Sequence, residues 1–135
     1  MAHPRTEGAP ALRLHIDIQS VEEVRSSRGV ARMIRFGGVA DGPYFRGAIL
    51  PGGVDTQREA DGAGGLSARY MLEGVDSAGE KCRIFIENEA AFGDAWTRPT
   101  LLTDSAALRW LESAPKAGRI VTEDGKLTIL IYAEP

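Results

Sequence analysis

The stretch FGGVADGPYFRGAILPGGVD, residues 36–55, carries the clearest structural signal in this chain of 135 residues. Two turn clusters, Gly37 to Pro43 and Pro51 to Gly53, flank a short strand-like run from Tyr44 to Leu50. Glycine permits positive φ angles and proline presets a turn, so both clusters predict sharp reversals of an extended chain. The stretch therefore predicts a β architecture, with Asp55 at the mouth of whatever the sheet encloses.

The composition argues against several classes of protein. The net charge is −3, and the scattered Lys and Arg residues form no block and no stacking platform with aromatics, which argues against a nucleic-acid partner. No run of about 18 apolar residues is present, so no membrane association through a spanning helix is expected. The single cysteine, Cys82, excludes an internal disulfide and fits a cytoplasmic location. Residues 1–11 lack the apolar segment of a signal peptide, so we expect a flexible leader and then one domain over residues 12–135.

Alternation of apolar and polar residues predicts most of the strands. The polar, glycine-rich segment Val54 to Gly65 is interpreted as a long loop, and Ala106 to Ser113 as a short helix capped by Asp104 or Ser105. Asp124-Gly125 is a strong signal for a two-residue hairpin turn. The expected strands are 12–18 with a continuation over 21–25, then 30–36, 44–50, 66–75, 82–88, 119–122 and 127–132, while 96–98 and 101–102 are left open.

Seven or eight strands in hairpin order, with one short helix before the last two, indicate an all-β meander. A meander of about eight strands removes its edges by closing into an antiparallel up-and-down β-barrel, which is just wide enough to hold one small ligand. A two-sheet sandwich is the alternative that the strand count leaves open.

The string Gly42-Pro43, Gly47, Pro51-Gly52-Gly53 and Asp55, followed by Arg69-Tyr70 on a later strand, resembles a family known as DUF3237 or UPF0311. The resemblance extends from about residue 12 to residue 133 and includes Trp110-Leu111 and the closing Ile131-Tyr132. It implies a calycin-like, lipocalin-like eight-stranded barrel. It implies no settled activity, because the role of the family is largely undefined.

The chain departs from the family pattern near the expected barrel mouth. Thr56 follows Asp55 where the family usually has an aromatic residue, and Asn88-Glu89-Ala90 stands in place of an Asn-x-Gly sequence. The turn at 76–80 is also longer than the expected Asp-Gly turn. The first two changes leave room for an altered site in this member.

Three charged residues are candidates for catalysis. Asp55 could act as a carboxylate at the cavity mouth, although a turn or capping role is the plain alternative. Arg69 could present an inward guanidinium to an anionic oxygen, or could be a solvated residue on the outer face. Tyr70 must then face the opposite way, and the sequence leaves open which of the two faces inward. Glu87 is a second candidate base, with the same uncertainty about its direction.

Three further residues are candidates for ligand binding. Tyr70 and Asn88 would be sparse polar groups in an apolar interior, the usual composition of a ligand pocket, or else a satisfied buried pair. Trp96 could close over an apolar guest, or could simply pack in the core. The two histidines and Cys82 have no metal-ligand spacing, so neither a metal nor another cofactor is expected.

The leading functional hypothesis is binding of a small, largely apolar molecule in the barrel. Cofactor-independent acid/base chemistry of the isomerase, cyclase or lyase type is the further step, with Asp55 or Glu87 as base and Arg69 or Tyr70 holding an oxyanion. The alternative is a structural or interaction protein whose barrel is filled by bulky side chains, in which an exposed edge could pair two subunits into a homodimer. Met33, Tyr44, Phe45, Met71 and Phe85 are the residues expected to fill such a barrel.

Overall fold

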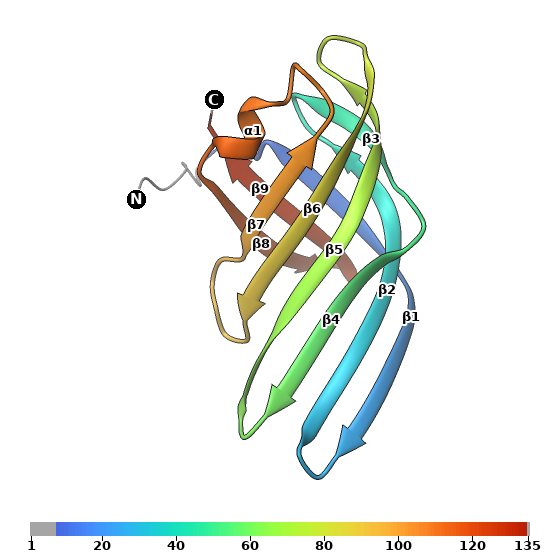
Figure 1. Ribbon diagram of the computed structural model, residues 1–135, viewed down its shortest axis with the longest axis vertical. Helices are drawn as coiled ribbons and strands as arrows, with labels where there is room; N and C mark the ends of the chain where they lie inside the picture. The colour runs from blue at the N-terminus through green and yellow to red at the C-terminus, as the bar shows by residue number, and fades with distance from the viewer. Residues whose placement is uncertain (1–7, 135) are drawn as a thin grey trace.

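The computed structural model describes residues 8–134, so most of the expected leader lies outside the described residues. Within this range nine β-strands and one short helix form, and all nine strands join one antiparallel sheet (Figure 1). One continuous sheet excludes the sandwich. The elements are β1 (Leu12–Ser26), β2 (Gly29–Asp41), β3 (Phe45–Ile49), β4 (Gly53–Ala60), β5 (Ala63–Asp76), β6 (Lys81–Ala91), β7 (Arg98–Thr103), α1 (Trp110–Ser113), β8 (Lys116–Glu123) and β9 (Lys126–Ala133).

The prediction of a long loop over residues 54–65 is wrong. This segment forms β4 and the start of β5, joined by a two-residue turn at Asp61 and Gly62 with φ angles of 53° and 75°. Two consecutive positive φ angles define the type I′ turn that suits a hairpin, and Asp124 with Gly125 forms the same turn at 52° and 74°. The expected helix at 106–113 is also shorter than predicted, because only Trp110–Ser113 is α-helical.

The predicted number of eight strands is corrected to nine, although the strands fill eight positions around the sheet. The order is β7-β6-β5-β3-β2-β1-β9-β8, and β4 follows β3 in the same place between β2 and β5. Val39 and Ala40 of β2 pair with β3, whereas residues 30–36 pair with β4. The turn at Pro51-Gly52 therefore divides one strand position into two strands.

The barrel does not close continuously. Its two outer strands, β7 and β8, meet through an isolated bridge between Thr97 and Gly118, with N···O distances of 2.8 and 3.0 Å. A Cβ on Gly118 would collide with the Thr97 hydroxyl oxygen, so glycine allows the close approach of the backbones at this seam. Figure 1 shows the β1–β2 and β4–β5 hairpins extending past the other strands at the opposite end from α1.

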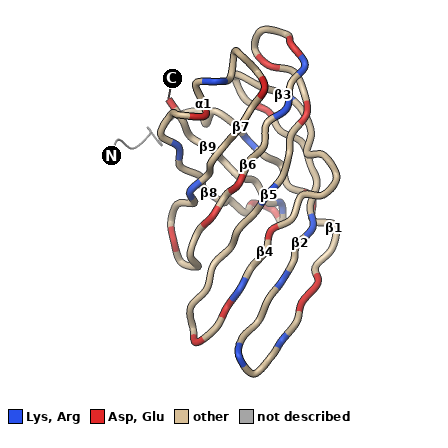
Figure 2. The backbone as a smooth tube through the Cα atoms, in the orientation of Figure 1, with Lys and Arg blue, Asp and Glu red and all other residues tan. Residues whose placement is uncertain are grey.

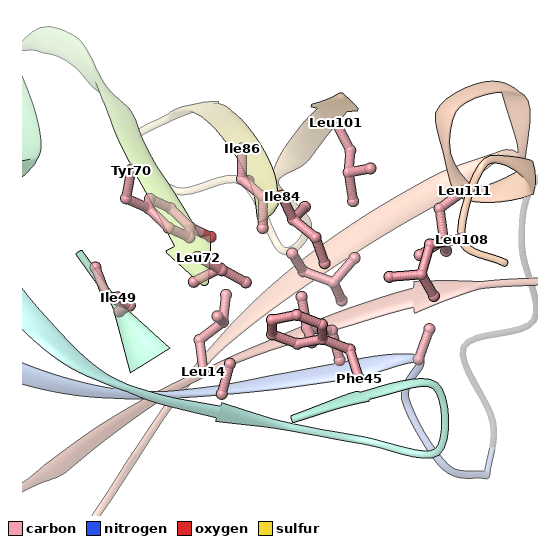
Figure 3. Close-up of a cluster of buried hydrophobic side chains, with 14 of the residues drawn as sticks. Leu14, Phe45, Ile49, Tyr70, Leu72, Ile84, Ile86, Leu101, Leu108 and Leu111 are labelled. Atoms are coloured by element: carbon pink, nitrogen blue, oxygen red, sulfur yellow. The ribbon is translucent and has the colours of Figure 1, made fainter. Parts of the chain in front are cut away.

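The half of the barrel next to α1 is packed solid with apolar side chains (Figure 3). Phe45 belongs to this core, but Met33 is 45% exposed and Met71 and Phe85 alternate with buried neighbours on the outer face, so the filling differs from the predicted set. Burial of this apolar surface is the main stabilising contribution to the fold. The bulkiest fully buried side chains are Leu14, Leu72, Ile84, Ile86, Leu108 and Ile131. No helix in residues 8–134 is long and apolar enough to cross a membrane.

Candidate functional site

A cavity of about 210 Å³ occupies the half of the barrel that the core leaves unfilled. It is lined mainly by aliphatic side chains from β1, β2, β5, β8 and β9. Ile18 and Ile120, which are 52% and 42% exposed, place its mouth at the solvent. The lining residues are Ile16, Ile18, Ile34, Phe36, Asp55, Gln57, Leu66, Ala68, Tyr70, Asn88, Ile120, Leu127 and Ile129.

Strand register places two polar side chains in one row across the cavity wall. Asp55 of β4 pairs with Ala68 of β5, and Ala68 pairs with Asn88 of β6, so all three point to the same face. Neighbouring strands lie about 4.8 Å apart, which separates the Cα atoms of Asp55 and Asn88 by roughly 9–10 Å. The small methyl group of Ala68 leaves the space between the two polar groups open.

Tyr70 forms the boundary between the cavity and the packed core. It lies two residues beyond Ala68 on the same face of β5 and is only 4% exposed. Its ring meets Phe36 edge-on, with ring centroids 5.4 Å apart and an interplanar angle of 69°. The hydroxyl oxygen is buried without a hydrogen-bond partner, and burial raises the pKa of the phenol far above its ordinary value. Tyr70 therefore remains a neutral hydroxyl that can still donate or accept a hydrogen bond.

Asp55 is an acid in a largely apolar environment. Its Oδ2 accepts a hydrogen bond from Gln57 Nε2 at 2.9 Å, while its Oδ1 is buried and has no partner. Burial raises the pKa of Asp55, and the hydrogen bond from Gln57 opposes that shift only in part. No Lys or Arg is among the residues that line the cavity. A carboxyl held in this way can exchange a proton closer to neutral pH than an exposed aspartate can.

Unpartnered polar atoms are concentrated at this cavity. Within residues 8–134, four buried side-chain oxygens or nitrogens lack a hydrogen bond, and three of them belong to Asp55, Tyr70 and Asn88. The fourth is the hydroxyl oxygen of Thr97 at the nearby seam. Buried polar atoms are nearly always hydrogen-bonded in native proteins, so such a cluster demands an explanation.

The structure thus brings together three of the six candidate residues. Asp55, Tyr70 and Asn88 line one cavity. Arg69 is exposed on the outer face of β5, where it lies opposite Glu87 of β6 in the register. Tyr70 rather than Arg69 therefore faces the interior.

The sixth candidate, Trp96, is not among the residues that line the cavity. It packs edge-on against Tyr132 at a centroid distance of 6.0 Å, with the guanidinium carbon of Arg119 5.6 Å from its ring centroid. Cys82 is buried in the core, and His15 forms an exposed pair with Asp41. Among the described residues, no group of three His, Cys, Asp or Glu side chains is arranged to hold a metal ion.

Gln57 is the residue of the site that the sequence interpretation missed. It holds Asp55 from two positions along β4, the spacing that puts two side chains on the same face of a strand. In a loop this spacing has no meaning, because side chains alternate between two faces only along a strand. The sequence signal for β4 and for this pair is the Asp61-Gly62 dipeptide, which is typical of a two-residue hairpin turn.

Three solved structures with similar folds show how this architecture recurs. A protein with unknown function from Clostridium acetobutylicum ATCC 824 is 23% identical, with a TM-score of 0.75 over 92% of this chain and 93% of that one. A beta-barrel like protein from Acinetobacter baumannii AYE is 21% identical, with a TM-score of 0.74 over 93% of both chains. An enzyme from Penicillium herquei is 17% identical, with a TM-score of 0.69 over 94% of this chain and 98% of that one. At these identities the likeness establishes the barrel-like fold alone.

The sequence comparison identifies a family but no activity. Residues 6–89 match the family model described as "Protein of unknown function (DUF3237)". No curated protein matches the chain. The match covers more than half of the sequence and includes Asp55, Tyr70 and Asn88.

Proposed function

The chain belongs to the DUF3237 family, and we propose that it binds a small, largely apolar organic molecule in the barrel cavity and exchanges a proton with it through Asp55. One observation carries this proposal. Three buried, unpartnered polar atoms belong to residues that line a largely apolar cavity. Sparse polar groups in an apolar enclosure are the usual means by which a protein orients a small ligand.

The size of the cavity limits the ligand. An engineered apolar cavity of about 150 Å³ binds benzene, so the 210 Å³ available here accommodates one ring with a short substituent. No cationic side chain lines the wall, and an anionic group buried beside Asp55 would be repelled without compensation. The favoured ligand is therefore uncharged where it enters the cavity.

The placement of the polar groups suits proton transfer. Asp55 lies on one side of the gap above Ala68, and Asn88 lies on the other, with Tyr70 one row further in. A ligand with its carbonyl oxygen near Tyr70 and Asn88 would present an adjacent C–H or O–H bond to Asp55. The hydroxyl and the amide would then stabilise the developing oxyanion while Asp55 takes the proton and later returns it. This describes cofactor-independent isomerisation or cyclisation.

The likeness to the enzyme from Penicillium herquei supports a catalytic reading only at the level of the fold. The packed half of the barrel supports the alternative of a structural protein, since much of the interior is filled by its own side chains. The ligand-binding hypothesis and the structural hypothesis differ in whether the unfilled half of the barrel holds a ligand. Occupation of the cavity by a ligand is therefore the deciding measurement.

The test is a thermal-shift screen with uncharged cyclic ketones, lactones, phenols and quinones of one ring, and with apolar acids for comparison. A ligand at 100 times its dissociation constant stabilises the protein by about 2.7 kcal/mol and raises its melting temperature. Ala68→Leu should fill the gap and abolish the shift, whereas Ser67→Leu on the outer face of β5 should leave it intact. Asp55→Asn should retain binding and lose turnover. Failure of every compound to shift the wild type would overturn the proposal.

A further inference from the structure

The outward-pointing charged side chains of β6 are basic in the first half of the strand and acidic in the second half. Every second residue of β6 points outward, and these residues are, in order, Lys81, Arg83, Phe85, Glu87 and Glu89, with Ala91 at the end of the strand. The inward residues between them are buried, which fixes the direction of the set. Two basic residues thus precede an aromatic residue and two acidic residues follow it. Figure 2 shows the charged positions along this strand.

The neighbouring strands extend the pattern into a patch. Phe85 lies in one row with Met71 of β5 and Leu102 of β7, and Leu102 is 63% exposed. We name these three residues the apolar row. On β5 the charges beside it are reversed relative to β6, because Glu73 lies opposite Arg83 and Arg69 lies opposite Glu87.

Most of these charges are not used within the protomer. Arg83 pairs with Glu73 at 2.9 Å. Lys81, Glu87 and Glu89, in contrast, form no ion pair and no side-chain hydrogen bond with any residue in the range 8–134. Met71 and Phe85 are half-buried and Leu102 is exposed, so the apolar row is only partly shielded from solvent. A partly exposed apolar row flanked by unpaired charges is typical of a contact surface rather than of plain solvated sheet.

We propose that this face binds a second copy of the chain about a two-fold axis that runs along the apolar row. Such an axis lays β6 antiparallel over β6 of the second copy. Lys81 then faces Glu89 of the other copy, and Arg83 faces Glu87. On β5, Glu73 faces Arg69 in the same way. Phe85 packs on Phe85 at the centre. Every charge on β5 and β6 in these rows then has an opposite charge facing it, which is the self-complementarity that an isologous dimer requires.

The contact is small, so the dimer is weak and reversible. Three strands about 4.8 Å apart and five rows about 6.8 Å apart cover about 500 Å² per protomer. Stable complexes bury about 800 Å² per partner. The face lies on the outside of the barrel, so the proposal holds whether or not the cavity binds a ligand.

The decisive experiment is sedimentation equilibrium from about 10 µM to about 1 mM protein, the range in which so small an interface associates. The dimer fraction should rise with concentration at low salt and fall in about 0.5 M NaCl, which screens the charge pairs. Leu102→Asp should abolish the dimer. The control is Val39→Asp, because Val39 is an apolar residue of β2 that is 54% exposed but lies outside the proposed contact face. This substitution should leave the dimer fraction unchanged.

A pair of charge-reversed variants tests the geometry itself. The double variant Lys81→Glu/Arg83→Glu and the double variant Glu87→Lys/Glu89→Lys should each be monomeric, because each brings like charges together across the axis. An equimolar mixture should form a heterodimer, in which every facing pair is again opposite in sign. Circular dichroism verifies that each variant is folded. A wild type that stays monomeric up to the highest concentration would overturn the proposal, as would a dimer that ignores these substitutions.

Discussion

The two halves of the barrel interior are built from the same strands and filled in opposite ways. In the packed half, Leu72 of β5 pairs with Ile84 of β6, and both side chains are fully buried. Four residues away on each strand, the same inward face carries Ala68 and Asn88. The exchange of two bulky aliphatic residues for a methyl group and an amide opens the cavity.

This difference separates stability from the candidate function. Packed aliphatic rows stabilise the fold, because burial of apolar surface is the dominant favourable contribution. The row of Asp55, Ala68 and Asn88 buries little apolar surface and leaves polar atoms of Asp55 and Asn88 without hydrogen-bond partners. Natural proteins accept such local costs mainly where a site is needed. The contrast predicts that substitutions in the two halves affect different properties.

The largest effect on stability is expected from Leu72→Ala. Leu72 is 0% exposed at the centre of the packed half, so its truncation leaves a void and should lower the free energy of unfolding by about 3–4 kcal/mol. Leu127→Ala, at the wall of the existing cavity, should cost about 1 kcal/mol or less, because its side chain already borders open space. Urea denaturation of the two variants measures both values. Equal losses would contradict the division of the interior into two halves.

A smaller loss is expected from Gly118→Ala at the seam. The added Cβ would collide with the Thr97 hydroxyl oxygen, so the bridge between β7 and β8 must shift or break. Overpacking of this kind costs about 1–3 kcal/mol. Thr97→Ala in the same chain removes the obstructing oxygen and should restore part of the loss. A double-mutant cycle by chemical denaturation gives this coupling, and additive effects would show that the collision is not the cause.

The third effect depends on pH. Burial raises the pKa of Asp55 above its ordinary value of 3.8, so the folded state binds the proton more tightly than the unfolded state. Stability therefore falls as the pH rises from 3.8 through the folded pKa, and below 3.8 this penalty is absent. Asp55→Asn removes the penalty, so its stability relative to wild type should increase between pH 4 and pH 8. Asp17→Asn, at an exposed site on β1, is the matched control. A relative stability that does not change with pH would show that Asp55 is adequately solvated.

The sequence predicted those parts of the fold in which strict alternation reflects one buried face. Leu12 to Ile18, Leu66 to Val75 and Cys82 to Asn88 all lie within observed strands. β4 was missed because its sequence, GVDTQREA, is polar and its residues are only partly buried in the sheet extension. The Asp61-Gly62 turn carried the same signal as Asp124-Gly125, but no alternating strand preceded it.

The sequence identified three residues of the candidate site, but it left open which way their side chains point. Tyr70 and Asn88 fall on the apolar phase of their strands, which favours an inward direction, and the structure places both at the cavity. Arg69 and Glu87 are their direct neighbours and therefore face outward. That Asp55 and Asn88 share a row follows from the register of β4, β5 and β6, which depends on hairpin turns and packing that are distant in the sequence. A single sequence does not encode that register in any local pattern.

The smallest expected change in stability is also the one that separates binding from packing. Tyr70→Phe removes a buried hydroxyl that has no partner and keeps the ring that packs against Phe36. Loss of an unsatisfied polar group is neutral or stabilising, so the free energy of unfolding should stay the same or rise by up to about 1 kcal/mol. If the hydroxyl holds a ligand oxygen, a compound found in the thermal-shift screen should bind about tenfold more weakly, which corresponds to about 1.4 kcal/mol. Isothermal titration of both proteins with that compound, beside their unfolding curves, measures the two effects independently. A variant that is less stable but binds normally would assign the Tyr70 hydroxyl to the packed half and remove it from the site.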